Sequence, residues 1–226
     1  MDREDLVRNC EPRPLIVSHR HHFIFAAVPK TGTHSVRQAL REQLDDGDVE
    51  QVGLFVNKRF PWSELAAIQH GHLSLLQVRP YLGEAAFAAY FKFAFVRNPF
   101  DRFVSYCAFM LRGGDAFLHQ PQDAMRHFLF RDPPEQHILF QPQAALLVDA
   151  DGRTLLTDSV GRVEDMQGSY DAICARIGLT SRPLERINGT RRGDYRGYYT
   201  PDLIAGVTGR YAQDLELFGY GFEGPQ

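Results

Sequence analysis

The sequence predicts an α/β fold in which a parallel β-sheet is flanked by helices. Two apolar segments, His22–Val28 and Phe91–Val96, have the composition of buried strands, and each leads through a short loop into a helical pattern. Strands that alternate with helices are typical of a parallel sheet with helices on both faces. A chain of 226 residues, 44% of them hydrophobic, is long enough for one domain with a full core. We therefore expect a single domain over residues 1–226.

The first predicted strand is followed by a loop at Pro29–Thr33 and by a helix from about His34 to Leu44. In that helix Val36, Ala39 and Leu40 fall on one face, as expected for a helix packed on a sheet.

The second predicted strand ends at Arg97, and a helix begins directly after it. Asn98 is a good N-cap, and Pro99 suits the first helical position. We expect this helix to reach about Leu111, and a shorter helix over Gly83–Tyr90 to precede the strand.

Four further elements are expected in the second half of the chain. Ala144–Val148 and Thr154–Thr157 flank a turn and predict a hairpin. A helix over Asp165–Ile177 should end at Gly178, and the last helix should run from Thr200 to about Phe218.

Composition limits the function classes. The net charge of −3 gives no overall basic field, so a nucleic-acid partner is not expected. The three cysteines are widely spaced, with no C-x-x-C pair, which favours reduced thiols. No stretch approaches ~18 uninterrupted apolar residues, so we expect no membrane span and a cytoplasmic protein.

The loop Pro29–Thr33 is typical of an anion site, because unpaired N–H groups at a helix N-terminus attract negative charge. Gly32 allows a ligand to approach the backbone, and Thr31, Thr33 and Ser35 add hydroxyl donors. The P-loop pattern G-x-x-x-x-G-K-[ST] is absent, and Lys30 stands at the start of the loop instead.

The second strand–loop–helix unit offers another anion-binding group. Arg97 has a planar guanidinium suited to a phosphate, and Ser105 adds a hydroxyl two turns into the helix. Ligands of open α/β folds bind at the carboxyl edge of the sheet, where both units end. The alternative is that Arg97 pairs with a surface carboxylate and Ser105 caps a backbone carbonyl.

The segments "PKTGTHS" and "VRNPFDRFVSY" resemble the two cofactor motifs of sulfotransferases that use 3′-phosphoadenosine 5′-phosphosulfate (PAPS). The resemblance implies the P-loop-NTPase-like sulfotransferase fold, with PAPS as donor, adenosine 3′,5′-bisphosphate (PAP) as product and no required metal. It implies that Arg97 and Ser105, whose interval agrees with the family, bind the 3′-phosphate, and that Lys30 reaches the oxygen between phosphorus and sulfur. The loop residues implied to bind the 5′-phosphosulfate are Lys30, Thr31, Gly32, Thr33, His34 and Ser35.

A third segment, "QHGHLS", resembles the His-Gly-His element of heparan sulfate and uronyl 2-O-sulfotransferases. This resemblance implies that His72 is the catalytic base, with His70 as a supporting group or alternative. "GRVEDM" and the C-terminal segment resemble closing elements of the same carbohydrate sulfotransferases, which extends the similarity over a core of about residues 22–220. Arg191 or Arg192 would cover the nucleotide, or would belong to a solvated basic loop.

The predicted function is transfer of a sulfuryl group from PAPS to a hydroxyl of a carbohydrate or related small molecule. A histidine suits the base because it titrates near neutral pH, and Glu164 is a rival. The alternatives are a P-loop-type kinase of a small metabolite, or a non-catalytic nucleotide-binding protein. The histidines in "HRHH" at 19–22 lack the spacing of a metal site, so we expect none. The sequence leaves the acceptor and the oligomeric state open.

Overall fold

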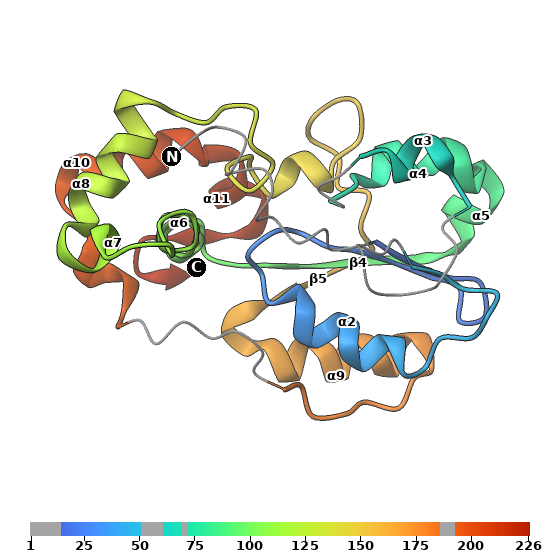
Figure 1. The fold of residues 1–226 in the computed structure, drawn as a ribbon. Coiled ribbons are helices and arrows are strands. Elements are labelled where there is room, and N and C mark those ends of the chain that lie inside the picture. Colours follow the sequence, from blue (N-terminus) through green and yellow to red (C-terminus); the bar gives the residue numbers. More distant parts are fainter. Residues whose placement is uncertain (1–14, 51–60, 69–71, 186–192) are drawn as a thin grey trace. The chain divides into compact units, whose positions relative to one another are not determined.

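A computed structural model describes residues 15–50, 61–68, 72–185 and 193–226 of the chain (Figure 1). The chain forms two compact units, the first comprising residues 1–96 and 145–187 and the second residues 97–144 and 188–226. The first unit contains the main β-sheet and the second is mostly helical, and each is described by itself. The single domain expected over residues 1–226 stays a prediction.

A five-stranded mixed sheet forms the centre of the first unit. Its strands are β1 (Ile16–Ser18), β2 (Phe23–Ala26), β3 (Val49–Glu50), β4 (Phe91–Val96) and β5 (Ser159–Arg162), in the order β3-β1-β2-β4-β5. β2 pairs in parallel with β4, and β4 pairs in parallel with β5. The carboxyl ends of these three strands therefore lie at one edge of the sheet, as the predicted α/β fold requires.

The predicted parallel sheet is found in part, because at the other edge β1 is antiparallel to both β2 and β3. Only residues 19–22 connect β1 to β2. A parallel connection needs a crossover of a dozen or more residues, so a link this short permits only a hairpin. The three-residue segment Ile16–Ser18 is too short to show a period, which is why the sequence did not predict it as a strand.

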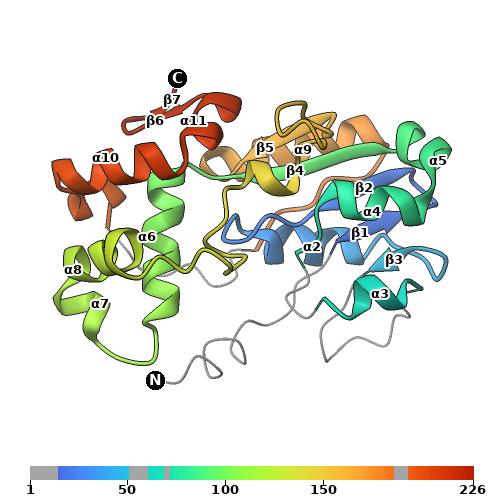
Figure 2. The ribbon, with the colours of Figure 1, turned by 90° about the horizontal axis from the view of Figure 1, so that it is seen from above.

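Helices cover both faces of the sheet in the first unit (Figures 1 and 2). Phe93 and Phe95 of β4 point to the face covered by α2 (Thr33–Arg41) and α9 (Met166–Ile177), where they join one buried cluster. The side chain of Lys92, which alternates with them, donates to the carbonyl oxygen of Phe87 in α5 on the other face. The helices on that side of the sheet are α3 (Ser63–Ala66), α4 (Leu75–Leu82) and α5 (Glu84–Ala89).

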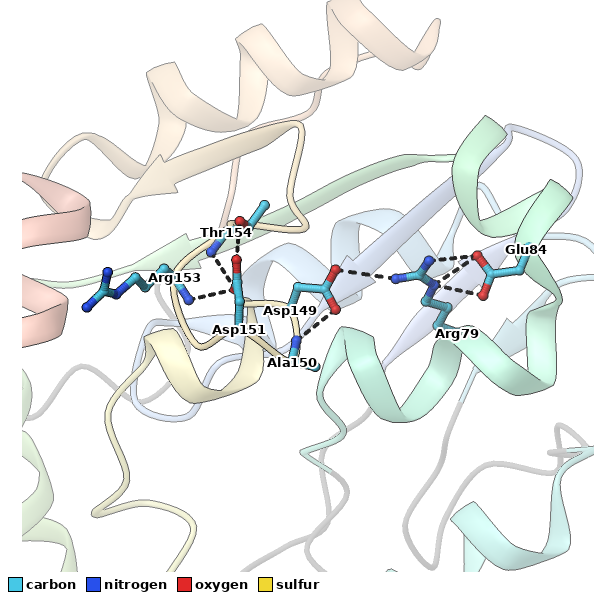
Figure 3. Close-up of polar contacts among 7 residues, drawn as sticks. All are labelled: Arg79, Glu84, Asp149, Ala150, Asp151, Arg153 and Thr154. Atoms are coloured by element: carbon cyan, nitrogen blue, oxygen red, sulfur yellow. Dashed lines mark hydrogen bonds and ion pairs between the residues drawn. The ribbon is translucent and has the colours of Figure 1, made fainter.

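The predicted hairpin is reduced to one antiparallel bridge, Val148 to Leu155, and residues Ala144–Leu146 form a 3-10 turn. Asp151 holds the intervening turn, because its carboxylate accepts the N–H groups of Arg153 and Thr154 at 2.8 and 2.9 Å (Figure 3).

Arg79 of α4 contacts Asp149 in the same turn at 3.4 Å and Glu84 of α5 at 2.8 Å, and so links the turn to both helices (Figure 3). Side-chain contacts of Asp149 and Asp151 therefore hold the turn where the sequence predicted two paired strands.

The second unit is formed by helices and one short hairpin. The cap expected at its first helix is confirmed, since the Asn98 side chain accepts the N–H of Phe100 and Pro99 occupies the first turn. The elements are α6 (Pro99–Met110), α7 (Ala116–His119), α8 (Pro121–Arg126), a π-helix (His127–Arg131), a 3-10 helix (Tyr195–Tyr198), α10 (Pro201–Arg210), α11 (Ala212–Phe218), β6 (Tyr220–Gly221) and β7 (Gly224–Pro225).

The last predicted helix is divided in two at Tyr211, whose backbone has φ of −114° and ψ of 28°. The Tyr211 ring is buried, and its hydroxyl donates to the carbonyl oxygen of Phe140 at 2.9 Å. This tertiary hydrogen bond accompanies a break that the helical pattern of the sequence does not show. In the part of the chain that the structure describes, no helix is long and apolar enough to cross a membrane.

Candidate active site

The loop between β2 and α2 has a backbone suited to an anion. Lys30 and Gly32 both adopt the left-handed conformation, each with φ of 67°. Thr31 between them is buried, and its hydroxyl donates to the carbonyl oxygen of Val28 at 2.8 Å, which fixes the turn. α2 then begins at Thr33 with no side chain capping its N-terminus. The first-turn N–H groups and the positive end of the helix dipole therefore favour negative charge at this loop.

Three predicted ligand-binding side chains lie in the first turn of α2. The side chains of Thr33 and Ser35 are largely buried, at 5% and 6% exposed. His34 is partly exposed, but its Nε2 atom is buried and has no hydrogen-bond partner among the described residues. The structure thus places the predicted loop residues, from Lys30 to Ser35, in one continuous strand–loop–helix segment.

Gly32 is needed at this loop for two separate physical reasons. Its φ of 67° disfavours residues that carry a Cβ atom. A Cβ atom built at Gly32 would also lie 2.5 Å from Cε and 3.1 Å from Sδ of Met166, the first residue of α9. Met166, the last residue of the segment "GRVEDM", therefore packs against the loop at Gly32. The sequence alone did not indicate this contact.

We expect Gly32→Ala to lower the free energy of unfolding by about 1–2 kcal/mol through the left-handed conformation of a residue with a Cβ atom, and by a further amount through the close contact with Met166. Urea denaturation measures this change. Gly114→Ala is the matched control, because its φ is not positive and a Cβ atom there meets nothing within 4 Å. A second Met166→Ala change removes the close contact but not the backbone strain, so it should restore stability only in part. Equal stability of Gly32→Ala and the control would contradict this account.

His72 lies beside the strand that leads into the loop. Its side chain is 3% exposed, and Nδ1 is 2.7 Å from the carbonyl oxygen of Ala27, the residue that follows β2. A carbonyl oxygen can only accept, so Nδ1 carries the hydrogen in this contact. In the neutral imidazole, Nε2 is then the atom that can take up a proton. The helix α4 that follows is fixed at its start by the capping box of Ser74 and Gln77.

The structure describes only one of the other candidates for the base and the nucleotide-covering arginine. His70, Arg191 and Arg192 lie outside the described residues. Glu164 is exposed, in the 3-10 helix Val163–Asp165 that leads from β5 into α9. The choice of His72 over these residues stays a prediction, and its contact with Ala27 is the observation that favours it.

Arg97 follows β4 directly in sequence, and its guanidinium is held by Asp101 one helical turn further on. Nε and Nη2 of Arg97 lie 2.6 and 2.5 Å from the same carboxylate oxygen, Oδ2. This is the carboxylate pairing that the sequence left open as an alternative, and the i, i+4 spacing is a signal that could have identified the partner. The pair fixes the plane of the guanidinium and leaves its role toward a phosphate to experiment. Ser105 lies in the buried part of α6, at 8% exposed.

Two residues that the sequence did not single out, Gln143 and Asp214, are fully buried in the second unit, where Gln143 contacts Arg97 and Asp214 contacts Gln143. The amide side chain of Gln143 bonds both the N–H and the carbonyl oxygen of Arg97, at 2.9 Å each. Asp214 lies on the buried side of α11, between Tyr211, which precedes the helix, and Phe218, which ends it. An acidic residue on an apolar helix face is the signal that could have marked it. Gln143 gives no such signal.

Comparisons with known proteins bear on the first half of the chain. Neither the curated proteins nor the solved structures contain a match. Among the described residues, no group of three or more His, Cys, Asp or Glu side chains is placed to hold a metal ion. Residues 13–110, which are fewer than half of the chain, match the model of the Sulfotransferase family. Both motif-bearing segments, the Lys30 loop and the Arg97–Ser105 stretch, lie within these residues.

Proposed function

We propose that the protein transfers a sulfuryl group from PAPS to a hydroxyl of a carbohydrate or related small molecule. The observation that carries the proposal is the loop of residues 27–32. It joins a buried parallel strand to an uncapped helix N-terminus, with Lys30 in the loop and His72 hydrogen-bonded to its first residue, Ala27. Such a loop suits a phosphosulfate, and an imidazole anchored at Nδ1 suits a general base.

In the proposed mechanism each group of the loop has a separate task. First-turn N–H groups of α2 and the hydroxyls of Thr33 and Ser35 orient the 5′-phosphosulfate, which supplies the sulfuryl group. Nε2 of His72 takes the proton of the acceptor hydroxyl as its oxygen forms the new bond to sulfur. The bond between sulfur and the bridging oxygen breaks, and Lys30 stabilises the charge that develops on the departing phosphate.

Arg97 and Ser105 of the second unit have a different proposed task, which is recognition of the 3′-phosphate. A guanidinium offers parallel N–H donors that match a phosphate. Asp101 already orients that guanidinium from the first turn of α6. PAP should therefore bind much more tightly than AMP, which lacks the 3′-phosphate.

A small-molecule kinase is the second candidate, and metal dependence separates the two. Kinases rely on Mg²⁺ to neutralise the charge on the phosphates, whereas the proposed transfer relies on Lys30 and the loop N–H groups. We expect the purified chain to transfer label from sulfur-labelled PAPS to a hydroxyl acceptor in excess EDTA.

This experiment uses a panel of neutral and acidic glycans, sterols and phenols as acceptors, with ATP and Mg²⁺ as the parallel donor arm. Activity with ATP and Mg²⁺, and none with PAPS, would show a kinase. Tight binding of PAP without transfer to any acceptor would instead indicate a non-catalytic nucleotide-binding protein.

A further inference from the structure

The backbone of Arg97 is held by a side chain rather than by a neighbouring strand. Oε1 of Gln143 accepts the N–H of Arg97 at 2.9 Å, and Nε2 of Gln143 donates to its carbonyl oxygen, also at 2.9 Å. These are the two backbone groups that a paired strand would satisfy. One amide side chain therefore fixes the peptide groups on both sides of the Arg97 Cα atom.

Gln143 is itself fixed by Asp214 of α11. One carboxylate oxygen of Asp214 accepts the backbone N–H of Gln143 at 2.9 Å and its side-chain Nε2 at 3.3 Å. The other oxygen accepts the N–H of Ala144 at 2.8 Å. Both side chains are 0% exposed, and burial raises the pKa of the Asp214 carboxyl. This arrangement orients the Gln143 amide so that its two ends meet Arg97 in one way only.

A second buried charge holds the segment that carries Gln143. Arg102 of α6 is 2% exposed, and its Nη2 donates to the carbonyl oxygens of Leu139 and Gln141 at 3.0 and 2.8 Å. Burying charged groups is unfavourable unless they are paired and hydrogen-bonded, and replacing them by apolar residues is often neutral or stabilising. Asp214 and Arg102 together fix the backbone of the six-residue segment 139–144, and Gln143 links that segment to Arg97 by two hydrogen bonds.

We propose that Gln143, oriented by Asp214, is a positioning residue that sets where the Arg97 guanidinium meets the 3′-phosphate and thereby determines the preference for PAP over AMP. This inference rests on the proposed function. Asp101 fixes the side chain of Arg97 and Gln143 fixes its backbone, so the group is ordered before the nucleotide binds. A guanidinium that is already ordered loses less conformational freedom when the nucleotide binds. If the backbone of Arg97 shifts, the guanidinium loses its alignment with the phosphate.

The test is calorimetric titration of the full chain with PAP and with AMP. For Gln143→Leu we expect the dissociation constant of PAP to rise about tenfold, which is part of what a charged hydrogen bond contributes, while that of AMP changes little. The ratio of the dissociation constant of AMP to that of PAP should therefore fall about tenfold. Gln141→Leu is the matched control, because Gln141 lies in the same segment and its side chain bonds the carbonyl oxygen of Glu135 instead. Asp214→Asn, which keeps the shape of the side chain, should shift the ratio in the same direction.

A double change separates positioning from general disruption of the unit. In an Arg97→Ala background, Gln143→Leu should leave the ratio unchanged, because the group that it positions is absent. Equal weakening of PAP and AMP by Gln143→Leu would overturn the inference, as would an unchanged ratio. If the unaltered chain does not prefer PAP, the proposed function itself fails.

Discussion

Replacing His72 with alanine should lower turnover with PAPS by ~10²–10⁴-fold, the contribution that a positioned general base makes to a proton transfer. The affinity for PAP should stay near that of the unaltered protein, because the imidazole acts on the acceptor rather than on the nucleotide. Steady-state kinetics with a saturating acceptor and calorimetry with PAP measure the two quantities separately.

The structure suggests a control that separates the base from its anchor. In His72→Asn, the amide nitrogen can replace Nδ1 as donor to the carbonyl oxygen of Ala27, while the Nε2 atom is lost. This variant should be as inactive as His72→Ala and more stable. If it keeps its activity, His72 acts only by holding the strand end. If His72→Ala remains active while His70→Ala or Glu164→Ala is inactive, another residue is the base.

Replacing Lys30 with alanine should nearly abolish transfer, with a loss of about 10²–10³-fold in turnover, as found when one donor to a developing negative charge is removed. Lys30 already has a left-handed backbone with φ of 67°. Alanine at this position therefore adds no new kind of backbone strain, and the loss reports the missing ammonium group. Single-turnover rates with bound PAPS measure the chemical step directly.

Lys30→Arg provides the matched comparison for this prediction. It keeps the positive charge but places it on a longer, planar group, so we expect partial activity between that of Lys30→Ala and that of the unaltered chain. Full activity of Lys30→Ala, with PAP binding unchanged, would remove Lys30 from the mechanism. The donor would then be bound through the first-turn N–H groups of α2 and the hydroxyls of Thr33 and Ser35.

The sequence by itself determined the features that depend on neighbouring residues. The run of apolar residues at Phe91–Val96 predicted β4 with its observed bounds. Asn98 and Pro99 predicted the start of α6, and Gly178 predicted the end of α9, where its φ of 71° confirms the left-handed cap. These signals are local, because the caps depend on hydrogen bonds within one turn and a strand's apolar pattern on its own side chains. The same locality allowed the sequence to predict an anion site at the Lys30 loop.

Only the tertiary structure decided the features that depend on residues far apart in the chain. His72 and Ala27 are 45 residues apart, and Gln143 and Asp214 are 71 apart. The hydrophobic periodicity around one residue of such a pair does not indicate that the other residue will be its hydrogen-bond partner. A buried donor or acceptor must find its partner wherever the fold brings one. That requirement anchors the candidate base beside the loop and holds the backbone of Arg97.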